Sequence, residues 1–178
     1  MSAREAVLDA YETLLIERDD QAATIKAIAQ AAGCSKGGLL YHFPSKQALA
    51  DGLIDRLKRR TSNDIETMRT AEEGAVNYYL RTSAVTNDHF GRTLMAVTKI
   101  GASHSGTVEN ALSLVQERFL AELRHYCPNE TVAIAVLLLG DGLYYNEINS
   151  GFCCTAKRDV TPEVLAAAAT LIDATSPD

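Results

Sequence analysis

Residues 35–38 combine a hydroxyl, a cation and two glycines at the predicted start of a short helix. Ser35 is a good helix N-cap, because its hydroxyl can accept a hydrogen bond from a first-turn N–H group. Lys36 adds a positive charge, and Gly37 and Gly38 each cost a helix roughly 1 kcal/mol relative to alanine. This cost is easier to understand if the backbone must approach another molecule closely. A basic, glycine-bearing helix start suits the base edges and phosphates of DNA.

Two short helices joined by a tight turn would position these residues. Thr24 can cap the first helix, and Gly33 can end it, because glycine takes the left-handed conformation without steric penalty. Pro44 stops the second helix. Ser45 caps a third helix that begins at Lys46, where an ammonium group can reach a phosphate. The spacing therefore predicts a helix-turn-helix.

The predicted DNA contacts lie in this segment. They are Thr24, Ser35, Lys36, Gly37, Gly38, Leu39, Tyr41, His42 and Lys46. The whole chain has a formal net charge of −6, but residues 24–60 hold seven Lys and Arg against two Asp and Glu. This local excess of positive charge predicts the DNA-facing end. The basic run at residues 58–60 could add phosphate contacts, or it could be a solvated face that suits a helix C-terminus.

The segment resembles the DNA-binding domain of TetR-family transcriptional regulators. The residues that carry this resemblance are Thr24, the alanine-rich turn at 29–33, Ser35-Lys36-Gly37, Tyr41-His42-Phe43, and Lys46 with Leu49. The family usually has two aromatic residues before the histidine, and the first contacts a backbone phosphate. Leu40 stands there in this chain, so Tyr41 remains as the aromatic candidate for that contact.

The resemblance implies a homodimeric, ligand-responsive regulator, most simply a repressor of a palindromic double-stranded DNA operator. A small molecule in the second domain would move the helix that starts at Ser45 and change the separation of the two recognition helices. These helices must lie roughly 34 Å apart, or a multiple of that, to contact both half-sites.

The rest of the sequence also predicts helices, without a strand pattern of useful length. Helical patterns cover residues 3–18, 45 to beyond 65, 73–86, 88–102, 107–126, 129–150 and 161–174. We therefore predict an all-α protein with a helix-turn-helix domain at residues 1–46. Residues 47–178 would form a ligand-binding and dimerisation domain, with the helix from Ser45 joining the two.

The last two predicted helices carry a dimerisation signal. In residues 132–143, small and branched apolar residues alternate nearly all round the helix, which indicates burial on more than one side. Packing both helices against a second copy would make a four-helix interface, as the resemblance implies. The predicted interface residues are Val136, Gly140, Leu143, Glu147, Leu165, Ala168, Leu171 and Ile172. An intrachain core alone is the alternative.

Asp141 is an acid in a strongly apolar helix, where a charge is costly unless it is paired or solvated. It shares a helix face with Tyr144 and Tyr145, an arrangement that suits a flat cationic ligand. Alternatively, Asp141 pairs across the dimer interface. Other predicted cavity residues are Tyr79, Phe90, Met95, His104 and Phe119. We expect a small hydrophobic effector, cationic if Asp141 contributes. The Asp141-Gly142-Leu143 run resembles the corresponding helix in multidrug-sensing members of the family.

Enzymatic motifs are missing from the sequence, which has no GxSxG, Walker loop, GxGxxG after a strand or HExxH, so we expect neither catalysis nor a cofactor. The cysteines lack zinc spacing, and we predict no metal site. The alternatives are a redox- or metal-responsive regulator using Cys127, Cys153 and Cys154, and a helical adaptor without an effector. No apolar stretch approaches about twenty residues, and the start lacks a signal-peptide pattern, so we expect a cytoplasmic protein without a membrane partner.

Overall fold

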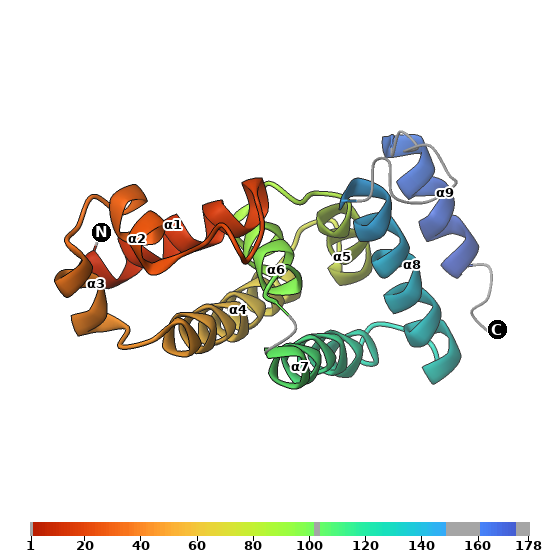
Figure 1. Ribbon diagram of the computed structural model, residues 1–178. Helices are drawn as coiled ribbons and strands as arrows, with labels where there is room; N and C mark the ends of the chain where they lie inside the picture. The colour runs from red at the N-terminus through yellow and green to blue at the C-terminus, as the bar shows by residue number, and fades with distance from the viewer. Residues whose placement is uncertain (1, 102–103, 149–160, 174–178) are drawn as a thin grey trace. The chain divides into compact units, whose positions relative to one another are not determined.

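The computed structural model describes residues 2–101, 104–148 and 161–173, and the regular elements in these ranges are all α-helices (Figure 1). They are α1 (Ala3–Glu17), α2 (Ile25–Ala31), α3 (Lys36–His42), α4 (Lys46–Arg69), α5 (Ala75–Ser83), α6 (His89–Thr98), α7 (Ser105–Leu123), α8 (Glu130–Ile148) and α9 (Pro162–Asp173). Each lies where the sequence predicted a helix, with ends that differ by a few residues. The predicted all-α fold class is confirmed.

The chain divides into two compact units. The first unit comprises residues 1–60 and 92–112, and the second comprises residues 61–91 and 113–178. This division differs from a boundary at residues 46–47, because the first part of α4 is packed into the first unit. Leu49, Leu53 and Leu57 of α4 are fully buried. Helix α4 is continuous from Lys46 to Arg69 and therefore contributes residues to both units.

The core of the first unit forms where α1, α2 and α3 contact one another. Leu8, Ile28 and Leu39 supply fully buried side chains, one from each helix. Phe43, which follows α3, lies against Gly52 in α4. A Cβ atom at position 52 would be 2.7 Å from the Phe43 ring, so the absence of a side chain at Gly52 lets the ring pack there.

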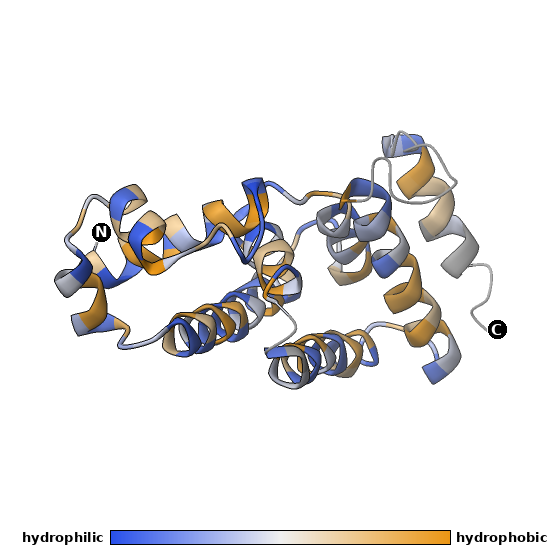
Figure 2. Ribbon diagram, viewed as in Figure 1, coloured by the Kyte–Doolittle hydropathy of each residue, from blue (hydrophilic) through white to orange (hydrophobic). Residues whose placement is uncertain are grey.

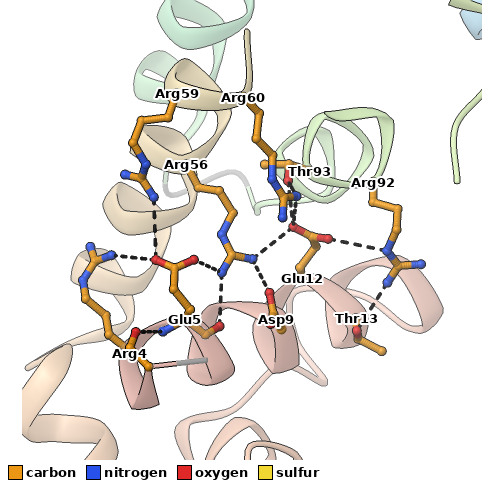
Figure 3. A network of polar contacts seen from close by, with 11 residues as sticks. Arg4, Glu5, Asp9, Glu12, Thr13, Arg56, Arg59, Arg60, Arg92 and Thr93 are labelled. Carbon is orange, nitrogen blue, oxygen red and sulfur yellow. Dashed lines mark hydrogen bonds and ion pairs between the residues drawn. The ribbon is translucent and has the colours of Figure 1, made fainter. Parts of the chain in front are cut away.

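A network of ion pairs links α1 to α4 inside the first unit (Figure 3). Arg56 is at its centre, with a side chain that is 3% exposed. Its guanidinium nitrogens lie 2.6 Å from a carboxylate oxygen of Glu5, 2.7 Å from Asp9 and 3.4 Å from Glu12. Partial burial of Glu5 raises the pKa of its carboxyl, but the hydrogen bond and the charge of Arg56 outweigh this and lower the pKa below its ordinary value. Arg56 thereby fixes one face of α1 to α4.

Glu12 extends this network to α6 (Figure 3). Its buried carboxylate accepts a hydrogen bond from Thr93 at 2.7 Å and lies 3.1 Å from Arg60. Arg92 of α6 is 3.5 Å from the other carboxylate oxygen. Arg60 also donates a hydrogen bond to Thr93. Of the basic run at residues 58–60, Arg60 is therefore committed to internal contacts rather than free for a phosphate.

In the second unit, α5 contacts α8 and α9. A Cβ atom at Gly140 of α8 would collide with the ring of Tyr79 in α5, so this glycine permits the close contact of the two helices. Val136 and Leu143, on the same helix, are also buried. The prediction that Val136, Gly140 and Leu143 form the dimer interface is therefore wrong, because these residues are covered within their own chain.

Helix α8 is strongly apolar, as Figure 2 shows. Among the described residues it alone is long and apolar enough, by length and composition, to cross a membrane. A single helix of this kind is weak evidence for a membrane span, since core helices share the same length and composition.

Candidate nucleic-acid interface

The predicted turn between α2 and α3 is present, and its hydrogen bonds explain why it forms. The Thr24 hydroxyl accepts a hydrogen bond from the Ala27 N–H at 3.1 Å, and the Ser35 hydroxyl accepts one from the Gly38 N–H at 3.0 Å. Gly33 has a φ of 66°, in the left-handed region that favours glycine. Both hydroxyls thus serve as helix caps, and each keeps its own proton for a further partner.

The start of α3 is an open surface. Lys36, Gly37 and Gly38 are exposed, and so is Tyr41, whose side chain is 84% exposed and packs edge-on against His42. Leu39 does not belong to this surface, because it is fully buried in the core of the first unit. Its predicted DNA contact is therefore wrong. An exposed large aromatic side chain beside a lysine and two glycines is suited to a polyanionic partner.

The two glycines differ in how much the fold needs them. A Cβ atom at Gly37 would have its nearest neighbour, the Ser35 hydroxyl, at an ordinary contact distance of 3.9 Å. At Gly38 the same atom would be closer, at 3.3 Å. Neither glycine has a positive φ. The fold therefore has no requirement for glycine at position 37, although glycine weakens a helix.

Lys46 begins α4 but does not extend freely into solvent. Its Nζ lies 2.9 Å from a carboxylate oxygen of Asp20 and also donates to the Asp20 carbonyl oxygen. The side chain is 32% exposed. Sequence reasoning missed Asp20, because it precedes Lys46 by 26 residues and the turn between α1 and α2 brings it close. The sequence signal for this contact was the acidic pair at residues 19–20, which lies next to a basic segment.

The predicted ligand-binding residues are divided between the two units. Tyr79, Phe90 and Phe119 form an aromatic cluster in the second unit, with ring centroids 5.3 Å apart for Tyr79 and Phe119 and 5.7 Å apart for Phe90 and Phe119. Met95 and His104 belong to the first unit instead.

Asp141 is half-buried in α8, and its carboxylate accepts a hydrogen bond from Gln116 of α7 at 2.8 Å. Burial raises the pKa of Asp141, while the Gln116 hydrogen bond opposes this shift. The rings of Tyr144 and Tyr145 contact each other edge-on. The Tyr144 hydroxyl is buried and has no hydrogen-bond partner among the described residues, whereas Tyr145 is 60% exposed. The two tyrosines therefore have different surroundings and do not form one ring-lined wall beside Asp141.

A cavity of about 420 Å³ in the second unit lies between α5 and α9. Its lining residues are Glu73, Asn77, Leu80, Arg81, Pro162, Leu165 and Ala166. None of the predicted ligand-binding residues lines it, although Leu165 was predicted at the dimer interface.

The remaining predicted interface residues are only partly described. Glu147, Leu165 and Ala168 are half-buried. The side chains of Leu171 and Ile172 lie outside the described residues.

Two of the four cysteines are described, Cys34 and Cys127, and both are free thiols of intermediate burial. Burial raises the pKa of the Cys127 thiol, which favours its protonated, less reactive form. Cys153 and Cys154 lie outside the described residues. Over residues 2–101, 104–148 and 161–173 there is no group of three or more His, Cys, Asp or Glu that could hold a metal ion.

Residues 7–53, which contain α2, α3 and most of α1, match the family model of bacterial regulatory proteins of the tetR family. The HTH-type transcriptional regulator AlkX of Mycobacterium tuberculosis is 38% identical over 76 residues, which are 43% of this chain and 35% of AlkX. The HTH-type transcriptional repressor KstR2 of Rhodococcus jostii is 41% identical over 51 residues, 29% of this chain and 25% of KstR2. The matching stretch thus spans about a third or less of each relative.

The fold can be compared over nearly the whole chain. NalD, the secondary repressor of the MexAB-OprM multidrug efflux pump in Pseudomonas aeruginosa, has the same fold with a TM-score of 0.67 and 16% identity. The comparison covers 95% of this chain and 94% of NalD. The helix-turn-helix at residues 24–42 lies within the matching stretch, so residues 7–53 form a helix-turn-helix domain of the tetR family of bacterial regulatory proteins, and the chain as a whole shares the fold of NalD.

Proposed function

We propose that this protein is a transcriptional repressor that binds a palindromic operator as a homodimer and leaves it when a small hydrophobic effector binds. The exposed start of α3 is the observation that carries the DNA-binding part. Repression is the first choice because KstR2 is named a transcriptional repressor and NalD is described as one.

The start of α3 fits DNA in charge, shape and hydrogen-bonding capacity. Lys36 supplies the cation. The fold would have room for a side chain at position 37, and glycine there leaves the backbone accessible to DNA. Tyr41 stands almost fully exposed on the same short helix. In a helix-turn-helix the first residues of the second helix contact base edges, while neighbouring groups bind phosphates. We therefore assign base contacts to Lys36 and Gly37, and a phosphate contact to Tyr41.

Fluorescence anisotropy with two labelled duplexes tests this assignment. One duplex carries the DNA upstream of the protein's own gene, and the other carries the same bases in scrambled order. Lys36→Ala is expected to weaken binding to the upstream duplex about tenfold and to reduce its preference over the scrambled duplex. Lys58→Ala removes the same charge from α4 and should leave that preference unchanged. Equal binding of the wild-type protein to both duplexes would contradict sequence-specific recognition.

Dimerisation is supported by an apolar face of α8 that the described part of its own chain leaves uncovered. Ile134, Leu138 and Tyr145 are large exposed residues on one face of this helix, and Leu138 is 62% exposed. Exposed apolar residues grouped on one helix are typical of a protein interface. A symmetric dimer would bury this face against the same face of a second copy.

The effector is proposed to bind in the second unit, near Asp141 and the aromatic cluster of Tyr79, Phe90 and Phe119. Burial of Asp141 penalises its negative charge, and a cationic ligand would relieve that penalty. Helix α4 supports the transmission of the effect, because one continuous helix contributes to both units. A ligand that binds the DNA-incompetent state about a hundredfold better shifts the equilibrium by roughly 2.7 kcal/mol.

Calorimetry with a cationic dye tests the role of Asp141. Asp141→Asn keeps the side-chain shape and an acceptor for Gln116 while it deletes the charge. Weaker dye binding to this variant, with unchanged binding of a neutral aromatic compound, is the expected result. If the dye binds both proteins equally, Asp141 has a structural role.

A further inference from the structure

Asp20 binds the ammonium group of Lys46, the group that is predicted to contact a DNA phosphate. Lys46 Nζ forms an ion pair with the Asp20 carboxylate at 2.9 Å and donates a hydrogen bond to the carbonyl oxygen of the same residue. An ammonium group has three N–H donors. One of the three is therefore donated to Asp20, and the positive charge has a negative charge beside it.

The Asp20 carboxylate is also held from other sides. The Tyr11 hydroxyl donates a hydrogen bond to it at 3.4 Å, and burial together with the charge of Asp20 raises the pKa of Tyr11, so this hydroxyl stays a donor. On another side, a Cβ atom at Gly101 would lie 2.6 Å from a carboxylate oxygen. Only 18% of the Asp20 side chain is exposed. Asp20 is therefore fixed in place and cannot simply rotate into solvent to release Lys46.

A phosphate that approaches Lys46 must compete with this partner. It must compete with the hydrogen bond and the ion pair that Lys46 makes to Asp20, and it meets a carboxylate of its own sign of charge close by. We propose that Asp20 is a positioning residue that limits DNA affinity, because it restrains and neutralises Lys46 in competition with the DNA backbone. This inference rests on the proposed DNA-binding function, and it adds a residue that acts against binding.

Asp20→Asn tests the proposal, because it keeps the size of the side chain and removes its charge. We expect the variant to bind the upstream and scrambled duplexes about fivefold more tightly, which is the upper end of the range for ion pairs that solvent still reaches. The gain should be equal on both duplexes, because phosphates carry no sequence. The logarithm of the binding constant should also fall more steeply with the logarithm of the salt concentration, by about 0.9 for one additional phosphate contact.

Two further variants separate this effect from a general change in charge. Asp19→Asn removes the same charge from the adjacent, exposed residue, whose carboxylate accepts a hydrogen bond from the Ala22 N–H. It should leave the salt dependence unchanged. In a protein that already carries Lys46→Ala, Asp20→Asn should lose its effect, which makes a double-mutant cycle. Thermal unfolding of each variant establishes that the fold is retained.

The outcomes distinguish this inference from the proposed function. If the wild-type protein binds neither duplex, the proposed DNA-binding function fails. If the wild type binds and Asp20→Asn binds equally or more weakly, the competitive role of Asp20 is overturned. A gain of the same size in Asp19→Asn, or in the Lys46→Ala background, would overturn it as well.

Discussion

Gly37 is the residue at which folding and binding make opposite demands. It is the second residue of α3, and a side chain there would meet only an ordinary contact with the Ser35 hydroxyl. Folding alone would favour alanine at this position. Close approach of the backbone to DNA would favour glycine, since a Cβ atom would occupy the space between them.

Gly37→Ala is therefore expected to stabilise the protein and to weaken DNA binding at the same time. The free energy of unfolding should rise by up to about 1 kcal/mol, the difference in helix propensity between alanine and glycine. Thermal unfolding and anisotropy measure the two effects separately. Gly106→Ala is the matched control, because Gly106 is likewise the second residue of a helix and has nothing within 4 Å of the position that a methyl group would take. It should stabilise the protein without affecting DNA binding; loss of affinity in both variants, or in neither, would contradict the role of Gly37.

The pKa of Asp141 gives a prediction about pH. Burial raises its pKa in the folded protein, so folding favours the neutral carboxyl and penalises the charged one. The penalty is present at neutral pH and is relieved as the pH falls through the folded-state pKa. Asp141→Asn should thus be at least as stable as the wild type at pH 7, and its advantage should shrink towards pH 4. Urea unfolding across this range measures it, and an advantage that grows as the pH falls would argue against this sign.

Single residues are predictable from the sequence where their role is local. Thr24, Gly33 and Ser35 act on backbone groups a few residues away, and their roles as caps and turn are confirmed. The sequence pattern places Leu39 on the wrong surface, because its burial depends on how α3 packs against the rest of the first unit. Asp20 is missed for the same reason, since its partner Lys46 is distant in sequence.

Among the elements, α1 and α4 depend on a buried set of charges. Arg56 is the donor to three carboxylates of α1, and Glu12 carries the network on to α6 (Figure 3). Removing one partner of a buried ion pair takes away part of the compensation for a charge that stays buried. The network is thus more important for the alignment of these helices than any exposed ion pair on the same surface.

Arg56→Ala is expected to lower the free energy of unfolding by up to about 3 kcal/mol, because buried Glu12 would lose one of its three cationic partners and keep Arg60 and Arg92. Lys58→Ala, on the same helix, removes an exposed pair with Asp55 and should cost less than about 1 kcal/mol. Denaturant unfolding of both variants provides the comparison. Similar, small losses in the two would show that the network adds little to stability.

The helices themselves could be predicted because their periodicity, caps and breaks depend on residues that are close together in the sequence. Pro44 and Ser45 separate α3 from α4, and the Ser45 hydroxyl accepts the hydrogen bond from the Ala48 N–H. Which face of a helix is covered could not be predicted in the same way. The apolar pattern of α8 indicated burial on more than one side, but the contact of Gly140 with Tyr79 decides which side packs within the chain.

At the scale of the whole molecule, the uncovered face of α8 predicts self-association. Leu138→Arg places a charge on this face and should produce monomers that bind the operator more weakly, because one half-site replaces two. Leu114→Arg changes an exposed leucine of α7 and serves as the control. Light scattering measures the mass of each variant. If Leu138→Arg remains a dimer at the same concentrations as the wild type, the interface lies elsewhere.

The division of the chain into units could not be predicted from the sequence. Residues 92–112 belong to the first unit although more than thirty residues separate them from its other segment, residues 1–60. Their attachment depends on long-range contacts such as the hydrogen bond from Thr93 to Glu12. The pattern of neighbouring residues does not indicate which distant residues pair with one another. The DNA-binding segment was recognisable because its turn, caps and charge lie within a continuous stretch.

The central claim is that the exposed surface of α3 contacts DNA, and photo-crosslinking tests it most directly. A benzophenone amino acid would replace Tyr41 in one protein and Tyr126, an exposed tyrosine of the second unit, in another. After irradiation with the labelled upstream duplex, we predict a crosslink from position 41 that unlabelled upstream DNA suppresses, and none from position 126. A crosslink from position 126 alone, or none from position 41 while the protein still binds the duplex, would contradict the account.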